Sequence, residues 1–158
     1  MADHDLMGSL RIKPYLRRLY VAVFLVFIVN KFVARPVVLD HDFPDFATTV
    51  VLSLPNTCEA IIGMSMSAGL LFAAKLRFSP HFDWIPDILI YLLATLVTAG
   101  YVLTQEYELH NLGENNVYDP YDVAASFIGL VGMLLVFSRF GIIEQVLEKN
   151  RAEPGVPS

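Results

Sequence analysis

The sequence is short of charge and of cysteine. Only 17% of its 158 residues are charged, against about 25% in an average soluble domain, and 55% are apolar. The single cysteine, Cys58, can form neither an intramolecular disulfide nor a cysteine-rich metal site. A soluble globular protein is therefore disfavoured, and packing must hold the fold together.

Positive charge is also scarce, and the formal net charge is −5. A nucleic-acid-binding protein needs a basic face that can contact phosphates, whereas the basic residues here lie beside apolar blocks. We therefore expect no nucleic acid as a partner, and we expect membrane lipids to surround the chain.

The apolar residues are collected in four blocks. The first is the uninterrupted run 19–29 with its extension to residue 34, and the others cover 56–74, 84–104 and 121–137. Each is near the length of about 20 residues that a helix needs to cross a hydrocarbon layer about 30 Å thick. The pattern predicts an all-α, polytopic membrane protein with a bundle of four transmembrane helices within residues 19–138.

The basic residues predict the orientation of this bundle. Nine of the 11 Lys and Arg residues lie in the amino-terminal segment, the loop 75–83 or the carboxy-terminal segment, and Lys and Arg near span ends stay on the cytoplasmic side. Residues 1–18 and 139–158 are thus expected to be cytoplasmic, so both termini lie inside. The two outer connections then carry mostly acids.

Small residues recur at helical spacing in the second and fourth blocks. Helices in lipid associate through close approach of small residues, and residues three or four apart lie on one face. In the fourth block the stripe is headed by Asp122, and a lipid groove along it is the alternative to a packing seam. The expected packing residues are Gly63, Ser67, Gly69, Ala125, Gly129 and Gly132.

Ionisable side chains gather where the expected spans reach the outer face. A charge near or inside a span is a functional candidate because the membrane makes it costly. With the orientation above, carboxylates from three helices and two cations from the first can meet at one polar mouth. The candidate ligand-binding residues are Lys31, Arg35, Glu59, Glu106 and Asp122.

Several of these residues also have a structural interpretation. Asp119 followed by Pro120 is typical of a helix start, with Asp119 as the N-cap and Asp122 favourable to the helix dipole. Glu59 can be a first-turn acid of the second span. Lys31 can extend its ammonium outward to the interface. The concentration of these residues, more than any one of them, indicates a site.

A metal centre and a catalytic centre are not predicted. Oxygen and imidazole ligands are present in the outer connections, but their spacing matches no metal signature, and a solvated acidic loop is preferred. No serine or cysteine lies in a nucleophile elbow or triad context. No cofactor is expected, although interfacial carboxylates can do acid and base work, which leaves a lipid-directed enzyme open. The ligands considered are Asp40, His41, Asp42, Asp45, Glu108 and His110.

Two stretches resemble a known family. Residues 118–132 read Tyr-Asp-Pro-Tyr-Asp-Val-Ala-Ala-Ser-Phe-Ile-Gly-Leu-Val-Gly, and residues 100–106 read Gly-Tyr-Val-Leu-Thr-Gln-Glu. They resemble the start of the last helix and the end of the preceding helix in the VanZ-like family of small bacterial membrane proteins. The resemblance covers roughly residues 16–140, and by motif match Glu106, Asp122 and Gly129 carry over.

Two functions from different classes follow. The resemblance implies a protein of the bacterial inner membrane, associated with the cell envelope, and the polar mouth predicts non-catalytic binding of an envelope component or a lipid headgroup. The alternative is a structural accessory subunit that packs against a larger membrane protein complex through its small-residue seams and aromatic-rich lipid face.

Overall fold

The computed structural model describes residues 10–78, 81–82, 84–106 and 119–145. Four of its helical segments are long and apolar enough to cross a membrane: residues 14–40, 45–77, 87–105 and 120–140. The prediction of an all-α, multi-pass bundle is confirmed. In chain order the elements are β1 (Leu10–Ile12), α1 (Pro14–Val29), the π-helix η1 (Asn30–Ala34), α2 (Arg35–Asp40), α3 (Asp45–Arg77), α4 (Asp87–Glu106), α5 (Pro120–Phe140) and β2 (Ile143–Gln145).

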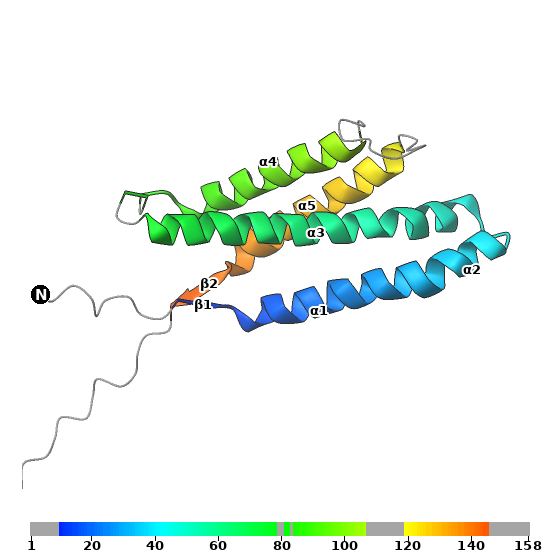
Figure 1. The fold of residues 1–158 in the computed structure, drawn as a ribbon, viewed down its shortest axis with the longest axis horizontal. Helices are drawn as coiled ribbons and strands as arrows, with labels where there is room; N and C mark the ends of the chain where they lie inside the picture. Colours follow the sequence, from blue (N-terminus) through cyan, green and yellow to red (C-terminus); the bar gives the residue numbers. More distant parts are fainter. Residues whose placement is uncertain (1–9, 79–80, 83, 107–118, 146–158) are drawn as a thin grey trace, which may run out of the picture.

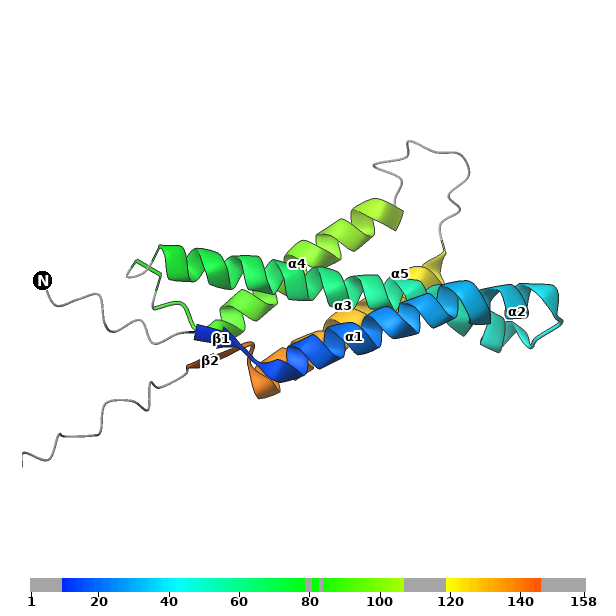
Figure 2. The same ribbon diagram turned by 60° about the horizontal axis from the view of Figure 1, so that its bottom comes forward.

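Helix α3 is the centre of the bundle. Helices α4 and α5 pack against it and against each other, whereas α1, η1 and α2 form one continuous rod that contacts chiefly α3. The turn between α2 and α3 projects beyond the ends of α4 and α5 in both views (Figures 1 and 2). We call residues 36–52, which run from α2 through this turn into the first two turns of α3, the α2–α3 hairpin.

A short ribbon joins the two ends of the described chain. β1 and β2 pair antiparallel, with Ile12 opposite Ile143, and the Tyr15 hydroxyl donates to the Gly141 carbonyl at 2.6 Å. Gly141 ends α5 with φ 65°, a backbone conformation that a side chain disfavours. The ribbon, which the sequence patterns did not predict, fastens the start of α1 to the end of α5.

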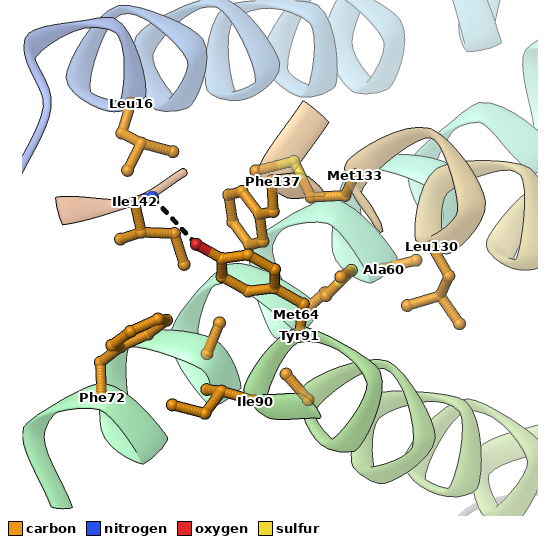
Figure 3. Close-up of a cluster of buried hydrophobic side chains, with 12 residues drawn as sticks. Leu16, Ala60, Met64, Phe72, Ile90, Tyr91, Leu130, Met133, Phe137 and Ile142 are labelled. Carbon is orange, nitrogen blue, oxygen red and sulfur yellow. Dashed lines mark hydrogen bonds between the residues drawn. The ribbon is translucent and has the colours of Figure 1, made fainter. Parts of the chain in front are cut away.

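Aromatic side chains fill the core next to this ribbon (Figure 3). The Tyr91 ring lies 5.6 Å from that of Phe72 and 5.5 Å from that of Phe137, centroid to centroid. Its hydroxyl accepts a hydrogen bond from the Ile142 backbone N–H at 3.3 Å. Tilted aromatic pairs of this kind stabilise beyond their buried area, so these three rings join α3, α4 and α5 at this end.

The boundaries expected for the first two helices were too short. The second block was expected to begin at residue 56, but α3 begins at Asp45 and continues through Pro55 to Arg77. Likewise the first rod extends from Pro14 to Asp40, which overlaps the expected cytoplasmic segment 1–18. Helices α4 and α5 differ from the expected blocks by no more than three residues at either end.

Helix α3 tolerates Pro55 because another helix supplies the missing donor. Proline has no backbone N–H, so the carbonyl four residues earlier, that of Val51, loses its helical partner. The Asn30 side-chain amide donates to this Val51 oxygen at 2.9 Å, and Asn30 is 2% exposed. Because an unsatisfied carbonyl is costly in lipid, this bond both permits the long helix and attaches the first rod to it.

We expect Asn30 and Pro55 to be energetically coupled. Asn30→Leu leaves the Val51 carbonyl without a donor and lowers the free energy of unfolding by about 1–3 kcal/mol. In a Pro55→Ala background the N–H of residue 55 can bind that carbonyl, so Asn30→Leu costs at least about 1 kcal/mol less. Unfolding of the wild type, the two single variants and the double variant in detergent micelles measures this cycle. If Asn30→Leu lowers the free energy of unfolding equally in both backgrounds, the role assigned to the Asn30–Val51 bond is contradicted.

The predicted small residues divide into two groups. Gly129 is buried, and a Cβ there would lie 2.7 Å from the Thr57 carbonyl oxygen of α3, while Gly63 faces α4, where a Cβ would lie 3.0 Å from the Thr98 methyl carbon. Gly69 and Gly132 face open space within the described chain. The other two members also contact neighbouring helices: the Ser67 hydroxyl lies 3.2 Å from that of Thr98, and the Ala125 carbonyl accepts from Thr57 at 3.0 Å.

We expect the paired substitutions Gly129→Ala and Gly132→Ala to have opposite effects. At Gly129 the added methyl meets backbone, which forces the helices apart and lowers the free energy of unfolding by about 1–3 kcal/mol. At Gly132 nothing lies near, and alanine raises helix propensity by up to about 1 kcal/mol. Thermal unfolding of the purified variants measures both effects. A loss of stability in Gly132→Ala but not in Gly129→Ala contradicts the assignment of Gly129 to the contact between α5 and α3.

Candidate functional site

The described chain has a polar cavity of about 240 Å³ between the first rod and the helices α3 and α5. It lies at the end of the bundle opposite the β1–β2 ribbon. Four of its lining residues carry a formal charge, and they come from three separate segments. The lining residues are Phe27, Lys31, Arg35, Leu52, Pro55, Asn56, Glu59 and Asp122.

The first wall is built by a change of helix type. The chain passes from α1 into the π-helix η1, and the Arg35 N–H donates to the Asn30 carbonyl five residues earlier. Pro36 follows directly and has no N–H with which to continue the α-helical pattern. This wider turn carries Lys31, and Arg35 follows it at the start of α2; the Lys31 ammonium lies 5.8 Å from the centre of the Phe27 ring.

The second wall belongs to the middle of α3. Glu59 lies 14 residues after Asp45 in an unbroken helix, so the interpretation of Glu59 as a first-turn acid is wrong. It is exposed, whereas its neighbours Cys58 and Ala60 are buried in the bundle. The apolar side chain of Leu52 lies two turns earlier on the same wall.

The third wall is the first turn of α5. The Asp119 carboxylate accepts from the Tyr121 backbone N–H at 2.8 Å, which confirms Asp119 as the N-cap. Asp122 then lies in the first turn, half-buried and facing the cavity. Ser126, one turn on, donates to the Asn56 carbonyl at 3.5 Å, so α5 is fixed against the cavity side of α3.

The four charges of the cavity do not neutralise one another directly. Among the residues that the structure describes, the only ion pair within 4.0 Å joins Lys75 to Asp87, at the other end of the bundle, at 3.0 Å. Lys31, Arg35 and Glu59 are exposed. The cavity therefore offers two cations and two carboxylates whose hydrogen-bonding capacity is open to a ligand.

The carboxylates of the second and third walls lie far along their helices from the basic residues at the other ends. Glu59 precedes Arg77 by 18 residues of α3, about 27 Å of helix. Asp122 precedes Arg139 by 17 residues of α5, about 26 Å. These lengths approach the hydrocarbon thickness of about 30 Å. The cavity therefore lies at the opposite end of the bundle from Arg77 and Arg139 (Figure 1).

Not all predicted residues are brought together. Lys31, Arg35, Glu59 and Asp122 line one cavity, whereas Glu106 ends α4 and its side chain lies outside the described part. The outer-loop ligands Glu108 and His110 also lie outside the described residues. Within the described ranges no three His, Cys, Asp or Glu side chains are grouped as for a metal ion.

Sequence patterns missed the uncharged part of the lining. Phe27 and Leu52 belong to apolar runs and carry no distinguishing signal. Asn30 was overlooked as well, although a buried amide near a proline-containing helix is a recognisable signal: the proline frees a carbonyl that must find a donor elsewhere.

Comparison of the chain with family models, with curated proteins and with solved structures gives no match. The resemblance to the VanZ-like family therefore stays a prediction.

Proposed function

We propose that the chain is a VanZ-like protein of the bacterial inner membrane that binds the polar head of a lipid or another envelope amphiphile, without catalysis, in the cavity at the outer end of its bundle. The observation that carries the proposal is the convergence of Lys31, Arg35, Glu59 and Asp122 on one cavity. Charged side chains near a membrane span are costly unless they pair or bind something, and these four form no ion pair in the described part of the chain.

The surroundings of the cavity suit an amphiphile. Phe27 and Leu52 contribute apolar surface to its lining, and the neighbouring side chains of α1 that point outward, such as Phe24 and Val26, are exposed and apolar. A headgroup in the cavity can therefore keep its acyl chains beside the first rod. With both termini cytoplasmic, as the basic residues predict, this headgroup belongs to the outer leaflet.

The proposal predicts that cavity charges hold lipid through purification. Lys31→Gln combined with Arg35→Gln is expected to reduce the lipid retained per protein by roughly tenfold or more, because hydrogen bonds to charged groups are lost. Native mass spectrometry of protein purified from bacterial membranes measures the retained lipid. Asp40→Asn is the matched control, since Asp40 is exposed on α2 and is not among the residues that line the cavity.

Two outcomes contradict this proposal. One is equal retention of lipid in the double variant and the wild type at equal insertion level and equal thermal stability. The other is a wild-type protein that carries no lipid under conditions in which other membrane proteins of the same preparation do.

A second candidate, the accessory subunit, is favoured by the α2–α3 hairpin. Phe46 is 81% exposed and lies 13 residues before Glu59 on α3, about 20 Å further out along the helix. Leu39, at the end of α2, is exposed as well. These apolar side chains lie beyond the cavity toward the projecting turn (Figure 1), and exposed apolar patches of this kind mark contact sites. The partner this surface suits is the extramembrane part of another membrane protein.

This alternative predicts a partner whose binding depends on the hairpin. Phe46→Ser with Leu39→Ser is expected to remove a stoichiometric partner from protein purified in mild detergent, while Asp42→Ser, on the same hairpin, retains it. Size-exclusion chromatography with mass determination measures the complex. A wild-type chain that migrates alone under these conditions contradicts the subunit function.

A further inference from the structure

The charges of the cavity are divided between its walls. Both cations, Lys31 and Arg35, belong to the rod formed by η1 and α2, and both carboxylates, Glu59 and Asp122, belong to α3 and α5. Their formal charges sum to zero at neutral pH. A cavity with separated positive and negative walls is complementary to a ligand that carries both signs.

A purely anionic headgroup fits this arrangement poorly. Its phosphate can bind the Lys31 ammonium and the Arg35 guanidinium, which is a good phosphate ligand because it donates two parallel hydrogen bonds. The same headgroup would then face Glu59 and Asp122 with nothing to offer their oxygens, and like charges side by side in a partly desolvated site repel. A purely cationic headgroup could bind Glu59 and Asp122, but it would then face Lys31 and Arg35, whose positive charges repel it.

The lining also discriminates between kinds of cation. Quaternary ammonium groups are recognised by several aromatic faces arranged as a cage, whereas Phe27 is the one aromatic residue in this lining, and its ring already has the Lys31 ammonium 5.8 Å from its centre. A primary ammonium has three N–H donors, which match the acceptor oxygens of two carboxylates. The lining therefore favours a primary over a quaternary ammonium.

The volume limits how much of a ligand can enter. The cavity of about 240 Å³ is smaller than the roughly 300–1,000 Å³ of sites that enclose a whole drug-sized molecule. It suits a headgroup whose remaining parts lie outside, along the exposed apolar surface of α1.

We infer that the cavity selects a zwitterionic headgroup with a primary ammonium beside a phosphate, as in phosphoethanolamine lipids. The phosphate lies toward Lys31 and Arg35, and the ammonium lies toward Glu59 and Asp122. This inference rests on the proposed function and adds the class of headgroup and its direction in the site.

The test is a competition among lipids that share the same acyl chains. Wild-type protein is equilibrated with equal amounts of phosphatidylethanolamine, phosphatidylglycerol and phosphatidylcholine in mixed micelles, and native mass spectrometry measures the bound species. We expect phosphatidylethanolamine to be bound roughly tenfold more than either competitor. Equal or stronger binding of phosphatidylglycerol overturns the inference while leaving a headgroup site in place. Binding that is insensitive to every cavity substitution overturns the proposed function itself.

Charge-specific variants add a signature that a merely structural role does not produce. Glu59→Gln with Asp122→Asn keeps the shape of both side chains, and we expect the ratio of phosphatidylethanolamine to phosphatidylglycerol to fall to about one or below. Lys31→Gln with Arg35→Gln is expected to weaken the binding of phosphatidylethanolamine and of phosphatidylglycerol to a similar extent. Asp40→Asn, outside the cavity, leaves the ratio unchanged. A ratio that stays at the wild-type value in the carboxylate variant overturns the inference.

Two further measurements keep the test decisive. If a double variant does not insert, the single substitutions Asp122→Asn and Arg35→Gln replace it, and the wild-type preference stands as a test on its own. Free phosphoethanolamine distinguishes a lipid from a soluble zwitterion: we expect it to displace bound lipid only at concentrations far above those of a short-chain phosphatidylethanolamine. Displacement at equal concentrations overturns the assignment to a lipid.

Discussion

The requirement that backbone polar groups be satisfied inside a bilayer governs this structure. Pro55 breaks the internal bonding of α3, and the bond from Asn30 to the Val51 carbonyl restores it from another helix. That one contact explains why α3 can run unbroken for 33 residues. It also draws the first rod onto α3 immediately before Lys31, so the polar cavity lies next to the place where the two are joined.

The rest of the site follows from this junction. The π-helix begins at Asn30, so the residue that satisfies α3 is also the one at which the first rod changes its winding. Lys31 and Arg35 come directly after and face Glu59 on the helix to which Asn30 is bonded. On the α5 side of the cavity, the close contact of Gly129 with α3 brings α5 near enough for Asp122 to complete the lining. The residues that hold the helices together and the charged residues that line the cavity are thus separate, one or a few positions apart.

Much of this arrangement could be predicted from hydropathy and charge, because both have a direct physical cause in the bilayer. The number of spans, the N-cap at Asp119 and the grouping of Lys31, Arg35, Glu59 and Asp122 all follow from such patterns. The extent of α3 could not be predicted, because proline normally ends a helix and its compensating donor is distant in sequence. Which glycines lie at a helix contact could not be predicted either, because this depends on the angle at which the helices cross. Gly129 lies at a contact, whereas Gly132, three residues further on, faces open space.

The first rod is the least buried of the four candidate spanning segments, although Leu16, Val23 and Asn30 along it are buried against the rest of the bundle. Much of its remaining surface, including Phe24 and Leu25, is exposed and apolar. Under the proposed function, an amphiphile would therefore not need to leave the bilayer to reach the charged cavity. On that function it would reach the cavity by lateral diffusion within its own leaflet, so its rate of capture would be set by its surface density in that leaflet and not by its solubility in water.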